Sequence, residues 1–291
     1  MSDSPRTDQL LDESEETYCY GHPDTPTRLR CSRCDRPICG RCAIPASVGQ
    51  HCPECVAEAR RSRPKVRTAL AATAPAVLVL LVTNVVVYIG QQLLGFDAVT
   101  GRFAQVPGAI VDGEWYRLVT AMFLHAPNFV LHLLFNMYVL YVYGPHVEQA
   151  FGTRRFLVLY LGSGFVASAA SFAFGPCNAI GVGASGAIFG VAGALLVFTH
   201  NRRRQQFMAN FQRSLLLFIG LNLFLGFAIA GIDNVAHIGG LLAGGAIGAG
   251  FDRPEDRAAL GPQLATAALI IGIGVALVVW RSATFSCGFF G

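Results

Sequence analysis

Seven apolar runs between residues 69 and 280 constrain the fold of this chain more than any other feature. A helix needs about 20 apolar residues to cross the hydrocarbon core of a bilayer, with a range of about 17 to 25. The runs that reach or approach this length are 69–90, 128–147, 155–175, 184–200, 214–230, 234–250 and 263–280. Charged residues make up 14% of the 291-residue chain, against roughly 25% in a soluble domain. The sequence therefore predicts an all-α polytopic membrane protein.

Positive charge alternates between the connections of these runs, and this pattern predicts how the chain is oriented. Arginine and lysine gather in every second connection, within 60–67, 154–155, 202–213 and 253–257. The other connections contain Arg102 and Arg117, and Arg281 follows the last run. Cytoplasmic loops carry the excess of Lys and Arg, so we expect a multi-pass protein of the cell membrane with a cytoplasmic N-terminus and an external C-terminus. Because the clusters border membrane runs, they indicate topology and no nucleic-acid partner.

Changes in composition divide the chain into segments. The first residues are acidic and hydrophilic, so we expect a disordered tail and no secretory signal peptide. The predicted segments are an acidic tail at 1–18, a zinc-binding module at 19–57, a basic linker at 58–68, a transmembrane domain at 69–250, a cytoplasmic loop at 251–262, an additional transmembrane helix at 263–280 and an external tail at 281–291.

Seven of the nine cysteines lie between Cys19 and Cys55, and they predict metal binding. With one histidine they form four pairs, each separated by two residues: Cys19 and His22, Cys31 and Cys34, Cys39 and Cys42, Cys52 and Cys55. Two ligands at this spacing can reach one tetrahedral zinc ion, so eight ligands predict two structural Zn²⁺ ions. The reducing cytoplasm argues against disulfides here. Cross-braced and sequential pairings both fit the spacing, and we expect Cys177 and Cys287 to take no part.

Polar residues inside the apolar runs indicate a functional site, because a bilayer penalises each by a few kcal/mol. Ser185 opens the fourth run within Gly183-Ala184-Ser185-Gly186. Free backbone N–H groups at a helix N-terminus can stabilise an oxyanion there. His237, in the sixth run, precedes a small-residue stripe at Gly240, Gly244 and Gly248 that favours close packing, plausibly against Gly186, Gly190 and Ala194. Such packing would bring a neutral imidazole to the serine hydroxyl as its base.

Three further polar residues extend this candidate site. His132 and Asn136 are four residues apart in the second run, so they share a helix face and can both donate hydrogen bonds to an oxyanion. Asp233 lies four residues before His237 and fits either a catalytic triad or, more simply, a helix N-cap. Taken singly, each of these groups also fits structural hydrogen bonding between helices.

Together the motifs resemble those of the rhomboid family of intramembrane serine proteases. HLLFN at 132–136 is similar to the family's HxxxN, GASG at 183–186 to its GxSG, and AHIGG at 236–240 to its AHxxG. Trp115 and Arg117 are similar to the family's outer-loop WR motif, with Tyr116 inserted between them. The resemblance covers about residues 70 to 250. It implies a six-helix bundle, to which this chain adds a seventh transmembrane helix and the small cytoplasmic zinc module.

The resemblance also implies roles for individual residues. Ser185 would be the nucleophile, His237 the general base, and His132, Asn136 and Gly183 would form the oxyanion pocket. Phe189 would pack on His237. Glu148 would be a structural acid, which we expect to pair with Arg154 or Arg155.

The cysteine module resembles the B-box zinc finger over about 37 residues. It departs from that family at Cys52 and Cys55, where the family often has histidines. The resemblance implies a protein-interaction module that binds a cytoplasmic protein. A RING-like ubiquitin-ligase role is the weaker alternative.

The implied activity is that of a serine endopeptidase that cleaves transmembrane helices of membrane proteins through an acyl-enzyme, with no cofactor for the chemistry. Its partners would be transmembrane substrates and the lipid bilayer, and the Phe-rich fifth run would be a lateral gate. A catalytically inactive scaffold or binding factor of the same fold is the alternative. A transporter is less favoured, because transporters often contain internal repeats and none is visible.

Overall fold

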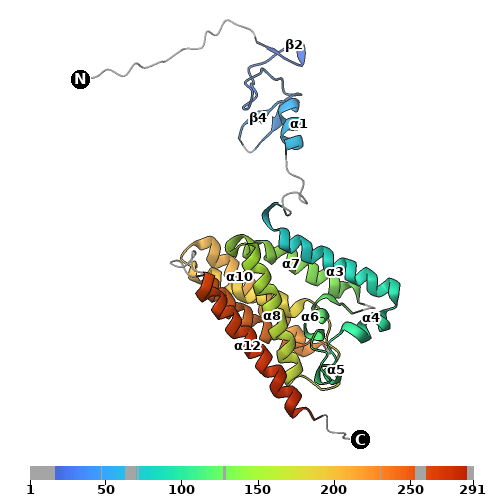
Figure 1. Cartoon of the computed structure of the whole chain (residues 1–291). Helices are drawn as coiled ribbons and strands as arrows, with labels where there is room; N and C mark the ends of the chain where they lie inside the picture. The colour runs from blue at the N-terminus through green and yellow to red at the C-terminus, as the bar shows by residue number, and fades with distance from the viewer. Residues whose placement is uncertain are drawn as a thin grey trace, which may run out of the picture. The chain divides into compact units, whose positions relative to one another are not determined.

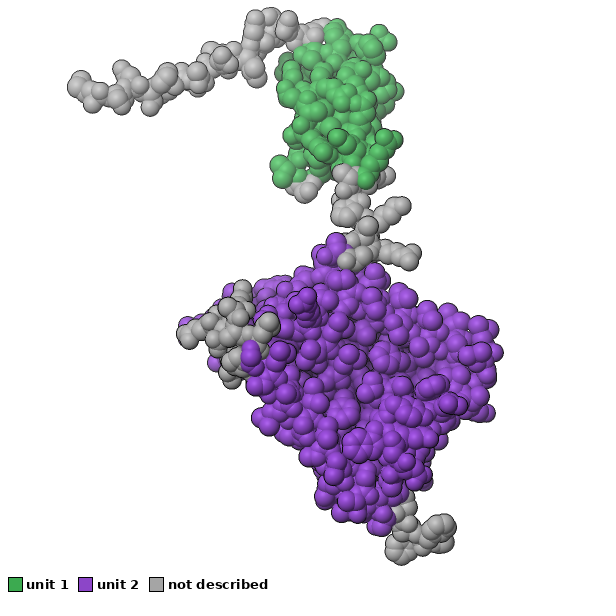
Figure 2. Space-filling view, viewed as in Figure 1, with its two compact units in different colours: residues 1–66 green, residues 67–291 purple. Residues whose placement is uncertain are grey.

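The computed structural model describes residues 17–46, 48–62, 70, 72–126, 129–229, 231–252 and 260–286. The chain forms two compact units, residues 1–66 and residues 67–291, which are coloured separately in Figure 2. Most of the expected tail at 1–18 lies outside the described residues, as do parts of the expected linker at 58–68 and loop at 251–262, and residues 287–291.

The first unit consists of two small antiparallel sheets and a helix. Strand β1 (Tyr18–Cys19) pairs with β2 (His22–Pro26), β3 (Ile44–Pro45) pairs with β4 (Gln50–His51), and α1 (Pro53–Ser62) follows. Its cluster of buried side chains contains six cysteines and Ile38. Units of this size usually need disulfides, metals or a partner in addition to such a small apolar core. The cysteines therefore make up most of the buried core of this unit.

The second unit is a helical bundle, in which each predicted apolar run corresponds to one long helix (Figure 1). These helices are α3 (Pro75–Leu94), α7 (Val130–Phe151), α8 (Thr153–Phe174), α9 (Ser185–Asn201), α10 (Gln206–Ala228), α11 (Asn234–Phe251) and α12 (Leu260–Thr284). Short helices fill the connection between α3 and α7: α4 (Phe96–Phe103), α5 (Pro107–Val111), α6 (Arg117–Thr120) and the 3-10 turn η1 (Ala121–Phe123).

Among the described residues, five helices are long and apolar enough to cross a membrane, namely α3, α8, α10, α11 and residues 263–284 of α12. Helix α9 is apolar but shorter, with 17 residues. Helix α7 has 22 residues but includes polar side chains such as His132, Asn136 and Glu148. Many large apolar side chains of the bundle are exposed, for example Leu217 and Phe227, as expected of a surface that faces lipid. The prediction of an all-α polytopic membrane protein is confirmed.

Several boundaries differ from the predicted runs: α10 begins at Gln206 rather than at residue 214, and α12 ends at Thr284 rather than at residue 280. Two further differences have local reasons. Helix α3 begins at Pro75 rather than at residue 69, because proline lacks the backbone N–H that a helix interior needs and is favoured in the first turn. Helix α7 continues beyond residue 147 to Phe151, and Gly152 alone joins it to α8. Gly152 has a φ of +85°, a conformation that side chains disfavour. This tight connection makes α7 and α8 antiparallel neighbours.

The most extensive helix interface joins α9 to α11, and it is a seam of small residues. A Cβ atom added at Gly240 would overlap the carbonyl oxygen of Gly186, and one at Gly244 would overlap that of Gly190. At Gly248 an added Cβ would lie 2.7 Å from Cβ of Ala194. The two backbones therefore touch directly, which is how helices associate in a membrane. The predicted pairing of the two stripes is confirmed.

Glu148 is buried in α7 and caps a different helix. Its Oε1 accepts hydrogen bonds from the N–H of Ala76 at 3.0 Å and from Oγ1 of Thr153 at 2.7 Å, and its Oε2 accepts one from the N–H of Val77 at 2.9 Å. These amides belong to the first turn of α3, which has no intrahelical partners for them. The expectation that Glu148 pairs with Arg154 or Arg155 is wrong, because backbone amides and a hydroxyl occupy its oxygens.

The additional helix α12 packs against α8 and α11. Two glycines make room for side chains of α12. A Cβ atom at Gly162 would lie 3.2 Å from Ile271, and one at Gly250 would lie 2.9 Å from Thr266. Beyond the helix, Phe285 stacks on Phe172 of α8 at 6.3 Å between ring centroids. Cys177 is disulfide-bonded, although the sequence suggested no role for it.

The cap at Glu148 predicts a stability defect. Glu148→Ala leaves buried N–H groups of α3 unsatisfied, so we expect the free energy of unfolding in micelles to fall by about 3 kcal/mol. Asp97→Ala, at an exposed position in the first turn of α4, is the control and should stay within about 0.5 kcal/mol of the parent. Equal stability of the two variants would contradict the capping role.

Candidate active site

Ser185 is the first residue of α9 and is half-buried. The loop before it is anchored: the N–H of Gly183 donates to the carbonyl of Ala121 at 2.9 Å. Gly183 has a φ of +128°, which favours glycine. The backbone N–H of Ser185 lies in the first helical turn, where no intrahelical acceptor exists. The local fold therefore presents the Ser185 hydroxyl beside the Ser185 backbone N–H, at the positive end of the α9 dipole.

His237 lies in the first turn of α11, and its ring reaches Ser185. The His237 Nε2 and Ser185 Oγ atoms are 3.0 Å apart, within the range for proton transfer between a nucleophile and its base. The Phe189 ring stacks on the imidazole, with centroids 4.3 Å apart and planes 7° apart. His237 is 7% exposed, so the ring is held between two helices.

Asp233 acts as the N-cap of α11 and not as a third catalytic group. Its Oδ1 accepts a hydrogen bond from the N–H of Ala236 at 2.9 Å, and its Oδ2 accepts one from Oγ of Ser171. His237 Nδ1 is buried and makes no hydrogen bond to the described residues. The sequence allowed Asp233 to be either a third catalytic residue or a helix N-cap, and the structure shows the N-cap.

His132 and Asn136 lie one turn apart on α7, and His132 borders the loop that precedes Ser185. A Cβ atom at Gly183 would lie 2.9 Å from Cε1 and 3.0 Å from Nε2 of His132, and 3.8 Å from Ser185 Oγ. The imidazole therefore lies against the Gly183 backbone beside the serine. Asn136 is 3% exposed, and its Nδ2 has no hydrogen-bond partner in the described part of the chain. Because the Gly183 N–H is already bonded, Gly183 provides space here rather than a donor.

His125 is a buried residue next to this site that the sequence reasoning missed. Its ring is 5.3 Å from that of His132, and Gln91 of α3 holds its backbone N–H and carbonyl, each at 3.1 Å. Burial lowers the pKa of His125 to about 4, so the ring is neutral at pH 7. The sequence did contain a signal for this residue: His125 lies in an apolar stretch, seven residues before His132.

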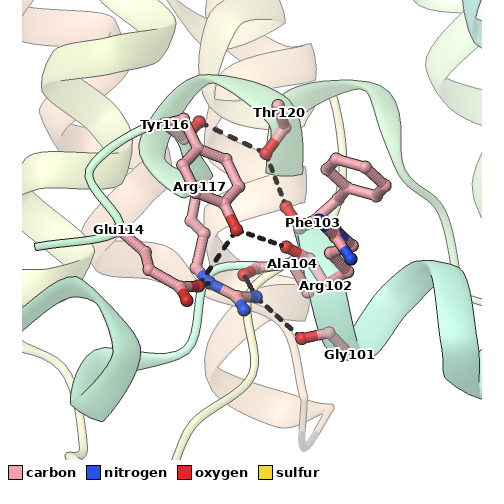
Figure 3. Close-up of polar contacts among 8 residues, drawn as sticks. All are labelled: Gly101, Arg102, Phe103, Ala104, Glu114, Tyr116, Arg117 and Thr120. Carbon is pink, nitrogen blue, oxygen red and sulfur yellow. Dashed lines mark hydrogen bonds and ion pairs between the residues drawn. The ribbon is translucent and has the colours of Figure 1, made fainter. Parts of the chain in front are cut away.

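Arg117 organises the long loop between α3 and α7 (Figure 3). It is 6% exposed and donates from Nη1 to the carbonyls of Gly101 at 2.8 Å and Ala104 at 3.0 Å. It also pairs with Glu114, whose pKa is held below its usual value by hydrogen bonds from Arg117 and then Tyr116. The WR-like segment therefore ties α6 to α4, while the Trp115 side chain stays exposed.

The eight predicted metal ligands form two clusters, and the pairing is cross-braced. Cys19, His22, Cys39 and Cys42 form one cluster, and Cys31, Cys34, Cys52 and Cys55 form the other, with ligand atoms within 4.8 Å of one another. Tetrahedral coordination at about 2.3 Å from sulfur implies sulfur–sulfur edges of about 3.8 Å. The Cys34 and Cys52 Sγ atoms are 3.8 Å apart, and His22 Nδ1 lies 3.5 Å from Cys39 Sγ and 3.2 Å from Cys42 Sγ. Both clusters therefore fit a tetrahedral ion such as Zn²⁺.

Comparison with known proteins matches residues 112–253 to the Rhomboid domain. The chain is 40% identical over 171 residues to "Rhomboid protease GluP" of Bacillus subtilis, which covers 59% of this chain and 32% of that protein. It is 33% identical over 148 residues to "Putative rhomboid protease YdcA" of the same organism, covering 51% of this chain and 71% of that protein. "Rhomboid-like protease 1" of Toxoplasma gondii is 33% identical over 182 residues, with 60% and 59% covered. The chain thus spans about a third of the first relative's length.

The seam between α9 and α11 predicts a difference between neighbouring glycines. Gly244→Ala places a Cβ atom on the Gly190 backbone, whereas Gly245→Ala meets its nearest neighbour, the Gly193 oxygen, at an ordinary 3.6 Å. We expect Gly244→Ala to lower the free energy of unfolding by about 1–3 kcal/mol. It should also slow any reaction that needs the Ser185–His237 contact by at least about tenfold. Equal behaviour of the two variants would contradict direct backbone packing.

Proposed function

Because this chain belongs to the rhomboid family, we propose that it is a serine endopeptidase that hydrolyses peptide bonds inside the membrane. The observation that carries this proposal is the 3.0 Å contact between Ser185 Oγ and His237 Nε2. A hydroxyl and an imidazole within hydrogen-bonding reach form an activated nucleophile. The same contact disfavours an inactive scaffold, which has no need of it.

In the first chemical step, Ser185 attacks the substrate's carbonyl carbon while His237 Nε2 takes the hydroxyl proton. The resulting tetrahedral oxyanion is stabilised by donors already in place. We assign these donors as the Ser185 backbone N–H, a ring N–H of His132 and Nδ2 of Asn136. Among the described residues the Asn136 Nδ2 has no hydrogen-bond partner, which supports this assignment, since a buried donor without an acceptor costs free energy until a ligand supplies one.

In the second step, His237 gives its proton to the leaving amine and the carbon–nitrogen bond breaks, which leaves an acyl-enzyme on Ser185. Water then attacks the ester with His237 again as base. The alternation of positive charge supports a position of this end of α9 in the outer half of the bilayer. Water therefore reaches the half-buried Ser185 from the external side.

We assign transmembrane helices of other proteins as substrates. Such a helix must enter the bundle sideways, and the contact of α7 with α10 is a candidate gate because it relies on aromatic rings. Phe135 stacks on Phe218 at 6.4 Å, and Tyr143 contacts Phe218 at 5.3 Å. Most of the candidate membrane span in α10 is unburied, with 11% inside the bundle, so α10 packs less tightly than the other helices around the site.

The first unit is proposed to hold two structural zinc ions in a B-box-like module at about residues 19–57. The near-tetrahedral spacing of its ligand atoms supports this. Zinc would supply the folding free energy that its small core lacks. We place the module in the cytoplasm, where it would bind another protein, and assign it no part in the chemistry.

Proteolysis is tested with purified protein and a single-span substrate. Ser185→Ala and His237→Ala should each lower the cleavage rate by at least about 10³-fold, and Asn136→Ala by about 10²-fold. Ser286→Ala, at an exposed serine beyond α12, serves as the control and should match the parent. Cleavage by Ser185→Ala at the parent's rate would rule out the proposed mechanism.

Zinc binding is tested by elemental analysis of the purified full-length protein. The parent should contain two Zn²⁺ per chain, and Cys52→Ser should lose one because tetrahedral sites need all four ligands. His51→Ala is the matched control, since His51 neighbours Cys52 but lies outside both clusters. Loss of zinc from His51→Ala with retention in Cys52→Ser would refute the ligand set.

A further inference from the structure

A chain of hydrogen bonds runs from the loop that carries Ser185 to the helix that carries His237. It begins at Gly181, four residues before the serine. Gly181 and Gln105 form an isolated antiparallel bridge, with N–H to carbonyl bonds of 3.0 Å and 2.9 Å. A Cβ at Gly181 would lie 3.2 Å from Cβ of Gln105, so the two segments lie in close contact. The outer loop therefore holds the nucleophile's loop through its backbone.

The side chain of Gln105 continues this connection to α8. Its Nε2 donates to Oγ of Ser171 at 3.1 Å and to the carbonyl of Ser168 at 3.3 Å. Gln105 is 5% exposed and Ser171 is 8% exposed. Buried hydrogen bonds of this kind are shielded from competition with water, so they hold their geometry.

Ser171 then passes the connection to α11. Its hydroxyl donates to Oδ2 of Asp233, and Oδ1 of Asp233 accepts the N–H of Ala236 at 2.9 Å. The N–H of His237 donates to the backbone carbonyl of Asp233 at 3.1 Å. The N-cap of the His237 helix is thus itself fixed by α8 and, through Gln105, by the loop before Ser185.

We propose that Asp233 is a positioning residue for His237, held in place by Ser171 and Gln105; this rests on the proposed protease activity. The glycine seam sets the distance between α9 and α11, and the axial position of His237 also depends on how the first turn of α11 is held. The capped end of α11 fixes that axial position. Asp233 acts through the first turn of the helix and does not contact the ring, because both carboxylate oxygens have other partners.

The test compares variants at Asp233 by steady-state cleavage of a single-span substrate. Asp233→Ala removes the cap, so kcat should fall by at least about tenfold while KM stays within about twofold. Asp233→Asn retains an acceptor for the Ala236 N–H and can bond to Ser171, so its kcat should recover to within about threefold of the parent. If Asp233→Asn is as slow as Asp233→Ala, positioning is refuted and the charge is what matters.

A second test concerns the hydrogen bond between Asp233 and Ser171 of α8. Ser171→Ala should lower kcat, and the Ser171→Ala/Asp233→Ala double variant should be no slower than Asp233→Ala alone, because residues of one network are not additive. Ser286→Ala is the serine control. Additive losses would refute the network.

Amide hydrogen exchange separates this proposal from the proposed function. In Asp233→Ala, exchange at residues 234–237 should be about tenfold faster than in the parent, and exchange in α9 unchanged. This readout needs no catalysis. An inactive parent would overturn the protease assignment, and unchanged exchange at the start of α11 would overturn the positioning role.

Discussion

The direct contact of the α9 and α11 backbones is the constraint on which the rest of the membrane unit depends. Lipid is as apolar as the helix surfaces, so helices in a bilayer gain little from hydrophobic burial and associate through close packing and hydrogen bonds. Glycine and alanine at matching positions permit that packing. Because Ser185 and His237 lie at the same end of this seam, the packing itself brings Oγ and Nε2 to 3.0 Å.

Polar side chains at the helix ends complete this arrangement. Glu148 caps α3 from α7, Asp233 caps α11 with help from α8, and Arg117 ties the loop between α3 and α7 together. At the opposite end of the seam, Arg202 forms a bidentate pair with Asp252, at 2.8 Å and 2.9 Å. Backbone groups in a membrane have no water as an alternative partner. Each of these side chains therefore holds a helix end or a loop in place by bonding to another segment of the bundle.

The sequence predicted what depends on local patterns and missed what depends on tertiary contacts. Apolar length predicted the seven helices, and small residues four apart predicted the seam. Paired cysteines predicted the residues of the two clusters, but spacing could not choose the cross-braced pairing, because the choice depends on how the strands fold back. The partners of Glu148 were mispredicted because the amides it caps lie about 70 residues away in sequence. His125 and Gln105 were missed because neither belongs to a recognisable motif.

The most direct test of the account is labelling of the purified protein with a fluorophosphonate, followed by mass-spectrometric mapping of the modified residue. A serine activated by a neighbouring imidazole reacts far faster than an ordinary hydroxyl. The account predicts modification at Ser185, slowed by at least about a hundredfold in His237→Ala. Modification of Ser185 at the same rate without His237, or of another serine instead, would contradict it.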